Sequence, residues 1–274
     1  MDSRTTPFNG RVAASALRGQ VEAEIFCDGT QANVIAALTD IRRAPDGPRL
    51  RQLLLGDAVT VYDTDQGYSY VQSTKDGYCG YVSSAALGPP TEPTHWVHAR
   101  ATHVYTDANI KSADTMLLSL GVRVTAKDEK NGFLEIGTGY VPKQHLTPVG
   151  QMAQNPLDVA RQFLGAPYLW GGNSSTGLDC SALVQAAYLN CGLPCPGDSD
   201  LQCAELGTPV DIGSPFQSGD LLFWTGHVAL ALSPDTMIHA TAHPMAVVTE
   251  NIQAALDRIN AQGDGPLIAH KRPE

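Results

Sequence analysis

The stretch Leu178-Asp179-Cys180-Ser181-Ala182-Leu183-Val184-Gln185 places a cysteine at the start of a predicted helix. Apolar residues follow Cys180 at spacings of three, four, seven and eight, the pattern of one helix face. Asp179 suits the N-cap position, and Gly192 followed by Pro194 ends the helix. A thiol in the first turn lies at the positive end of the helix dipole, which favours the nucleophilic thiolate. We therefore expect Cys180 to be a nucleophile, although a free cysteine taken alone is more often a small buried hydrophobe.

The composition describes a globular, multidomain protein. The chain has 274 residues, of which 43% are hydrophobic and 17% charged, and its 26 glycines and 18 prolines indicate many turns between strands. The net charge is −10 and no basic face stands out, so no nucleic-acid partner is expected. No apolar run approaches the roughly 20 residues that cross a bilayer, and residues 1–7 lack the hydrophobic segment of a signal peptide. We expect no membrane partner and a cytoplasmic location.

The six cysteines have no spacing typical of a disulfide framework, so free thiols in a reducing compartment are expected. Cys191, Cys195 and Cys203 are separated by three and seven residues and have no nearby histidine, which fits no common zinc site. A second pair of candidate ligands, His239 and His243, lacks a convincing third partner. The sequence therefore predicts neither a metal nor another cofactor.

An internal repeat occupies residues 39–149. The pattern Leu-Gly-x-x-Val-Thr-x-x-Asp begins at Leu55 and again at Leu120, an offset of 65 residues, and each copy closes with Gly-Tyr-Val, at Gly80 and Gly139. Short β-branched and aromatic segments between turn residues predict two small β-barrels. Each copy resembles a bacterial SH3-like domain, which implies binding of peptide or cell-wall material. The alternative is that a copy, the second above all, only serves as a packing spacer.

These copies give SH3-like domains over residues 39–92 and 93–149, preceded by an N-terminal arm (1–38) in which apolar residues fit short helices. A further domain is predicted over residues 150–274. It opens with a helix capped by Asn155 and carries the Cys180 helix next. Strands are then expected over residues 220–224, 227–232, 237–240 and 246–249, with a short helix over 252–259. Helices followed by an antiparallel sheet predict the α+β class.

Two histidines complete a candidate site with Cys180. Nucleophilic thiol chemistry needs a base within hydrogen-bond reach and a third polar group that orients the base. His227 opens a predicted strand, and His239 lies twelve residues later, across a probable hairpin. Because paired strands place side chains beside one another on one face, one imidazole can contact Cys180 while the other orients it.

Five motifs in order resemble the NlpC-type cell-wall cysteine peptidase family over roughly residues 151–274: Pro167-Tyr168-Leu169-Trp170-Gly171-Gly172, Asp179-Cys180-Ser181, Gly219-Asp220-Leu221-Leu222-Phe223-Trp224, His227-Val228-Ala229 and Ile238-His239-Ala240. The resemblance implies a circularly permuted papain-like fold, with Cys180 as nucleophile, His227 as general base and then acid, and His239 as the orienting residue. It also implies that Tyr168 steadies the oxyanion, beside the Cys180 backbone N–H. His243 is an alternative to His239 as the orienting residue.

The SH3-like repeats and the loop Cys195-Pro196-Gly197-Asp198-Ser199-Asp200-Leu201-Gln202 resemble one subgroup, the γ-D-glutamyl-L-diamino acid endopeptidases. This resemblance implies a cysteine endopeptidase of cell-wall recycling that cuts murein peptides after L-Ala-γ-D-Glu. The substrate's free amine and γ-D-Glu carboxylate would be bound by Asp179, Ser181, Asp198 and Ser199, and Tyr81 of the first SH3-like domain would close the site. Two departures from the family pattern are Ala182 in place of Gly and Gly197 in place of Arg.

Two other functions use the same observations. An acyltransferase or amidase could employ the same Cys-His site on another substrate, but such enzymes acting on lipids need a hydrophobic acceptor surface, and no exposed apolar run suggests one. A non-catalytic cell-wall-binding protein would not require the complete set of reactive residues.

Overall fold

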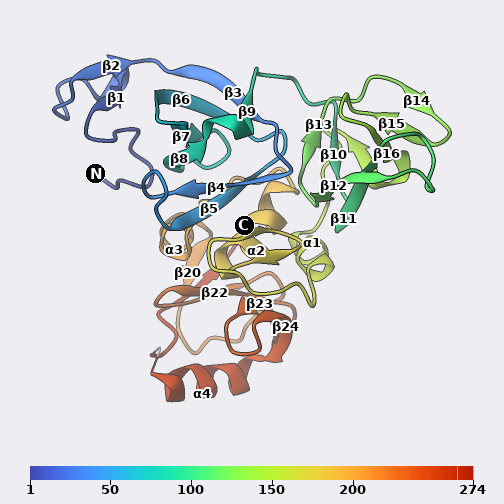
Figure 1. The fold of residues 1–274 in the computed structure, drawn as a ribbon. Helices are drawn as coiled ribbons and strands as arrows, with labels where there is room; N and C mark the ends of the chain where they lie inside the picture. The colour runs from blue at the N-terminus through green and yellow to red at the C-terminus, as the bar shows by residue number, and fades with distance from the viewer. Residues whose placement is uncertain (264, 274) are drawn as a thin grey trace. The chain divides into compact units, whose positions relative to one another are not determined.

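The structure of the protein, a computed structural model, describes residues 1–263 and 265–273; residues 264 and 274, which fall in the predicted C-terminal domain, lie outside the described residues. The chain divides into two compact units, residues 1–151 and 152–274 (Figure 1). Each unit is described by itself below. Within the described residues, no helix combines the length and the apolar character needed to cross a bilayer.

The N-terminal segment is built from short strands, so the prediction of short helices is wrong. β1 (Val12–Ala14) pairs in parallel with β2 (Ile25–Cys27), and only the 3₁₀ turn η1 (Ser15–Leu17) lies between them. All three residues of β1 are buried. An apolar run this short fits a helix or a strand equally well, and the partner strand decides between them.

The first SH3-like copy forms a seven-stranded sheet in the order β5-β4-β8-β7-β6-β3-β9. Its strands are β3 (Thr30–Val34), β4 (Leu38–Arg42), β5 (Arg49–Leu54), β6 (Ala58–Asp65), β7 (Tyr68–Ser73), β8 (Cys79–Ser83) and β9 (Leu87–Gly88). The core contains Val34, Ile41, Leu53, Val59, Val71, Tyr78 and Val82. Because β3 pairs with both β6 and β9, the sheet begins well before residue 39.

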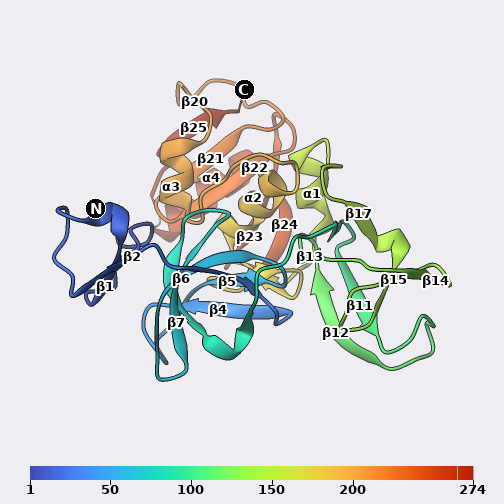
Figure 2. The same ribbon diagram turned by 90° about the horizontal axis from the view of Figure 1, so that it is seen from above.

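The second copy forms two smaller sheets, and β11 and β12 run side by side in Figure 2. One sheet has the order β13-β10-β17, from β10 (His95–Val97), β13 (Arg123–Val124) and β17 (Leu146–Pro148). The other has the order β12-β11-β16-β15-β14, from β11 (Ala101–Tyr105), β12 (Asp114–Ser119), β14 (Glu129–Lys130), β15 (Phe133–Glu135) and β16 (Tyr140–Pro142). Leu54 of the first copy is part of this second core, so the two copies share buried apolar surface.

The repeat seen in the sequence is also present in the backbone. Gln66-Gly67 and Asn131-Gly132 lie 65 residues apart and have φ values of 46° and 82°, and of 51° and 77°. Two positive φ values in succession are those of a type I′ hairpin turn. A Cβ at Gly80 would lie 2.8 Å from a carbonyl oxygen of the neighbouring strand, and one at Gly139 only 2.4 Å. Each Gly-Tyr-Val is followed by a 3₁₀ turn, η2 (Ser84–Ala86) and η3 (Lys143–His145).

The second unit is an α+β domain around a six-stranded antiparallel sheet in the order β20-β25-β21-β22-β23-β24. The strands are β20 (Thr208–Val210), β21 (Leu221–Trp224), β22 (His227–Ala231), β23 (Thr236–Thr241), β24 (Ala246–Asn251) and β25 (Ala269–Arg272). The helices are α1 (Pro156–Gln162), α2 (Cys180–Leu189), α3 (Ser199–Glu205) and α4 (Ile252–Gln262), and a small hairpin joins β18 (Asn173–Ser174) to β19 (Gly177–Leu178). The predicted strands and the predicted final helix are confirmed.

Helices cover both faces of this sheet. Alternate residues of β21, β22 and β23 pack against Ile252, Ala255 and Ile259 of α4. α2 contacts β22 and β23, and Figure 1 shows α2 and α4 on opposite sides of the sheet. The start of α2 therefore meets the middle of the sheet, where β22 begins.

Caps and a buried ion cluster fix the ends of these elements. The side chain of Asn155 accepts the N–H of Leu157 at the start of α1, as predicted. Just before β21, the buried carboxylate of Asp220 accepts hydrogen bonds from His270 at 2.6 Å and from Arg272 at 2.8 Å, both on β25. These bonds join the loop before β21 to β25 and therefore fix the centre of the sheet.

Candidate active site

Asp179 fixes the start of the helix that carries Cys180. Its Oδ1 accepts hydrogen bonds from the Ala182 N–H at 2.8 Å and the Ser181 hydroxyl at 3.0 Å, and its Oδ2 accepts the Gly171 N–H at 2.9 Å. The carboxylate thus caps α2 and ties the glycine-rich loop to it. Gly172 has no room for a side chain, since a Cβ there would lie 2.5 Å from a carbonyl oxygen.

Cys180 is buried against the backbone around His227. Its Sγ lies 3.9 Å from the carbonyl oxygen of Gly226, and the N–H of Val228 also faces the sulfur. β22 and β23 pair at Leu230–Ile238 and Ala231–Met237, a pairing that stops before His227, so the thiol lies where the strands have separated.

The protonation state of Cys180 differs from the expected thiolate. Burial, and then the negative charge of Asp179, raises the pKa of Cys180 to about 12. The N–H groups of Val228, of Ser181 and of Cys180 itself lower the pKa, as the helix-dipole argument expects, but less than burial raises it. Burial therefore favours the protonated form of the Cys180 thiol at neutral pH.

The two histidines meet side chain to side chain. Nε2 of His227 lies 2.9 Å from Nδ1 of His239, with ring centroids 5.1 Å apart. Burial is the largest cause that lowers the pKa of His227 to about 3 and that of His239 to about 4. Both rings are therefore neutral near pH 7, and a neutral His227 can accept a proton.

Two residues behind His239 were missed by sequence reasoning. Oε2 of Glu250, on β24, lies 3.2 Å from Nε2 of His239. Arg258, on α4, donates to both oxygens of that carboxylate, at 3.0 and 2.6 Å. The sequence did offer a signal, because a strand was expected shortly after His239. Pairing of that strand with the strand of His239 places Glu250 diagonal to His239.

Tyr168 and His243 line a hollow beside His227. The hollow has a volume of about 380 Å³ and is lined by Tyr168, Trp170, Thr225, Gly226, His227, Thr241, Ala242, His243, Arg258, Ile259 and Gln262. Burial raises the pKa of Tyr168, and the nearby Cys180 and Asp179 raise it further, so its hydroxyl stays a donor. Of the two candidate orienting histidines, the structure brings His239 to His227 and leaves His243 in the wall of the hollow.

The residues of this domain that are expected to bind substrate differ in how far they are buried. Asp179 and Ser181 are buried, and the contacts of Asp179 given above are internal. Asp198 and Ser199 are half-buried at the start of α3, and Gln202 of the same helix donates to the carbonyl of Ser181 at 2.8 Å. The segment that carries Asp198 and Ser199 is therefore held against α2, the helix that begins at Cys180.

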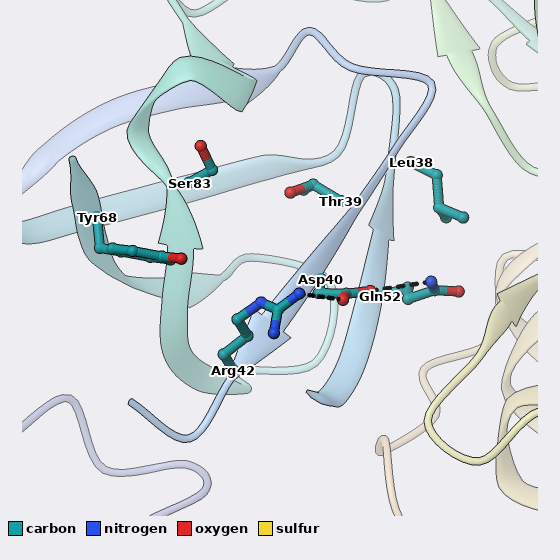
Figure 3. A pocket seen from close by; sticks show the side chains of 7 residues that line it. All are labelled: Leu38, Thr39, Asp40, Arg42, Gln52, Tyr68 and Ser83. Atoms are coloured by element: carbon teal, nitrogen blue, oxygen red, sulfur yellow. Dashed lines mark hydrogen bonds and ion pairs between the residues drawn. The ribbon is translucent and has the colours of Figure 1, made fainter. Parts of the chain in front are cut away.

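Tyr81 belongs to the other compact unit, and its part in the site stays a prediction. It lies half-buried on β8, with its ring 5.2 Å from that of Tyr70. The same barrel has a polar hollow of about 380 Å³, lined by Leu38, Thr39, Asp40, Arg42, Gln52, Tyr68 and Ser83 (Figure 3). The carboxylate of Asp40 accepts hydrogen bonds from Arg42, Arg49 and Gln52, so its oxygens are already paired with two guanidinium groups and an amide.

Comparison with known protein families finds a match for two segments of the chain. Residues 41–87 match the bacterial dipeptidyl-peptidase SH3 domain, and residues 165–257 match the NlpC/P60 family. The fold is accordingly the papain-like NlpC/P60 fold with an all-β N-terminal region.

Several relatives are similar over a larger part of the chain. A γ-D-glutamyl-L-lysine dipeptidyl-peptidase of Bacillus subtilis is 30% identical over 191 residues, which cover 61% of this chain and 62% of the relative. A protein of the same name from Bacillus cereus is 26% identical over 69% of this chain and 66% of its own length. The match to this chain thus spans less than two thirds of the length of each of these relatives. The crystal structure of an NlpC/P60 family protein from Bacillus cereus superposes with a TM-score of 0.73 and 21% identity over 89% of this chain and 99% of that one, a likeness of fold.

Proposed function

We propose that this NlpC/P60 protein is a cysteine endopeptidase that hydrolyses the γ-D-glutamyl–diamino acid bond of murein peptides with a free N-terminal L-Ala. The observation that carries the proposal is the position of Cys180, at the start of α2, against the backbone beside His227 on β22, whose ring meets that of His239 on β23. The names of the Bacillus relatives support the substrate class.

The reaction begins from a neutral thiol and a neutral imidazole. As Sγ of Cys180 attacks the γ-glutamyl carbonyl carbon, its proton passes to His227, which forms the imidazolium. The resulting oxyanion accepts hydrogen bonds from the Cys180 backbone N–H and the Tyr168 hydroxyl.

The intermediate then collapses to products. His227 gives its proton to the leaving amine as the C–N bond breaks, which leaves a thioester on Cys180. Water, deprotonated by His227, attacks the thioester and releases L-Ala-γ-D-Glu and the free thiol. His239 keeps the ring of His227 in place through both proton transfers.

Recognition of the free amine belongs to the same proposal. An ammonium group needs carboxylate and hydroxyl acceptors, and Asp198 and Ser199 supply both types close to α2. Tyr81 of the first SH3-like domain would close the site over that amine and exclude N-blocked wall strands. Such selectivity suits an enzyme of murein peptide recycling in the cytoplasm, a location that cell fractionation tests.

Mass spectrometry of cleavage products tests the function. The free tripeptides L-Ala-γ-D-Glu-meso-diaminopimelate and L-Ala-γ-D-Glu-L-Lys should release L-Ala-γ-D-Glu, while their N-acetylated twins should stay intact. Cys180→Ala and His227→Ala should lose at least about 10³-fold in kcat. Cys191→Ala, which removes another free thiol of the same domain, should keep the activity. Undiminished cleavage by Cys180→Ala contradicts the mechanism, and cleavage of the acetylated peptides contradicts the amine-gated site.

A further inference from the structure

We propose that Glu250 is a positioning residue that, through His239, decides which ring nitrogen carries the proton in both active-site imidazoles. The inference rests on the cysteine-peptidase mechanism proposed above and concerns a residue which that mechanism leaves unused. Glu250 lies on β24, one strand further from Cys180 than His239. It touches neither the thiol nor His227 in any contact given above.

The two ring nitrogens of His239 face different polar groups. The ring is fully buried, its Nδ1 meets Nε2 of His227 at 2.9 Å, and its Nε2 has no hydrogen bond among the described residues. The group that Nε2 faces is the Glu250 carboxylate, 3.2 Å away. The two atoms are within hydrogen-bond reach, although the bond is not well aligned.

The neutral ring of His239 has two possible tautomers. A neutral ring has one N–H, and here it can point to Glu250 from Nε2 or to His227 from Nδ1. If the proton were on Nδ1, a bare nitrogen lone pair would face a carboxylate inside the protein, which is strongly unfavourable. With the proton on Nε2, His239 donates to the carboxylate and its Nδ1 becomes an acceptor.

The tautomer of His239 determines the tautomer of His227. Because Nδ1 of His239 is an acceptor, Nε2 of His227 must hold the proton and donate it across the 2.9 Å contact. The remaining nitrogen of His227, Nδ1, is then unprotonated, which is the form that the proposed mechanism needs in order to take the proton of the Cys180 thiol. In the opposite arrangement His227 would present an N–H to the thiol and could not act as a base.

Arg258 keeps Glu250 able to do this. It donates from Nε and Nη2 to both carboxylate oxygens and from Nη1 to Gln262 at 3.0 Å. The charged and titratable groups around His239 are thus His227 on β22, Glu250 on β24 and Arg258 on α4. The hydrogen bond from Arg258 is the largest cause that lowers the pKa of Glu250, so the carboxylate is ionised throughout the neutral range.

The test combines nitrogen-15 NMR of the imidazoles with kinetics on the full chain. In the wild type, both rings should show the proton on Nε2 at pH 7. Glu250→Ala should populate the Nδ1-protonated form of His239 and lower kcat roughly 10- to 100-fold with KM nearly unchanged, as carboxylates behind metal-bound imidazoles do. Glu250→Gln keeps an acceptor oxygen and should restore most of both properties. Asp257→Asn removes an exposed carboxylate of α4 and serves as the matched control.

The proposal is overturned if wild-type His239 carries its proton on Nδ1. It is equally overturned if Glu250→Ala lowers kcat while both tautomers stay as in the wild type, because the role would then be structural only. The NMR measurement needs no substrate. A wrong substrate assignment would therefore abolish the kinetic comparison in the wild type as well, without changing the tautomers.

Discussion

Replacing Asp179 with asparagine should make the C-terminal domain less stable and the nucleophile more reactive at once. The carboxylate accepts three hydrogen bonds, from the N–H groups of Gly171 and Ala182 and from the Ser181 hydroxyl. It also raises the pKa of Cys180 through its negative charge. Asparagine has the same shape, one acceptor oxygen and no charge, so it separates these effects from packing.

The loss of stability follows from counting partners. If the amide oxygen takes the place of Oδ1, the NH₂ group faces the Gly171 N–H and leaves that buried donor unpaired, which costs about 1–3 kcal/mol. The bonds to Ala182 and Ser181 survive but lose their charge assistance, about 0.5–1 kcal/mol each. The expected total is about 3 kcal/mol, or roughly a hundred-fold in a local opening equilibrium.

Hydrogen exchange and alkylation measure the two effects on the same protein. Peptides covering α2 should lose about a hundred-fold in protection, while peptides of the first barrel, in the other compact unit, give an internal reference. Iodoacetamide should modify Cys180 faster at every pH between 7 and 9, because loss of the Asp179 charge lowers the thiol pKa. Asp158→Asn, which removes an exposed carboxylate of α1, should change neither measurement.

Unchanged protection of α2 in Asp179→Asn would refute the assignment of the carboxylate as the tie between loop and helix. Unchanged or slower alkylation, with protection lost, would refute the electrostatic part. In that case the charge of Asp179 would be screened from the sulfur, and burial alone would set the thiol pKa.

Two further predictions concern the first barrel and the pH dependence of the peptidase domain. Gly80→Ala should destabilise the first barrel by about 1–3 kcal/mol in urea denaturation. Its Cβ would lie 2.4 Å from the side chain of Ile41 and 2.8 Å from the carbonyl oxygen of Arg42. If the variant were as stable as the wild type, the strands could separate without cost. Burial lowers the pKa of His227 to about 3 and that of His239 to about 4, so the unfolded chain binds more protons than the native one below about pH 6.5. Stability should therefore fall as pH falls from there toward 4. A flat profile of urea midpoints over that range contradicts neutral buried rings.

Local sequence signals predicted the elements that carry the site. The apolar spacing after Cys180 and the preference of Asp179 for an N-cap both act within one or two turns, so they survive in any tertiary context. The hairpin that brings His227 and His239 together also depends on a short connection, and its strands were placed to within one or two residues. Short-range physics was enough for these parts.

The parts that were missed depend on partners far away in the chain. Val12 and Ala13 form a strand because β2 lies beside them, which no local pattern states. Glu250 faces His239 because β24 pairs with β23 in the register His239↔Val248, and that register is set by the turn around Met245, whose φ is 56°. A shift of one residue would turn Glu250 to the other face of the sheet.

The protonation state of Cys180 shows how burial outweighs a local effect and what that does to reactivity. The helix N–H groups favour the thiolate, but a buried sulfur without its counter-ion loses more by leaving water. Burial penalises the imidazolium of His227 for the same reason, so the neutral pair is the resting state. In the proposed mechanism, the two charges would attract each other in a medium of low dielectric once the proton has moved. Attack on a bound carbonyl would then transfer the sulfur's charge to an oxyanion that accepts hydrogen bonds from the Cys180 N–H and the Tyr168 hydroxyl. A small alkylating reagent brings no such oxyanion, so Cys180 should react slowly with it and rapidly with its substrate. In that mechanism, burial of both partners would give the site its selectivity, because a permanently charged thiolate would react with any electrophile that reached it.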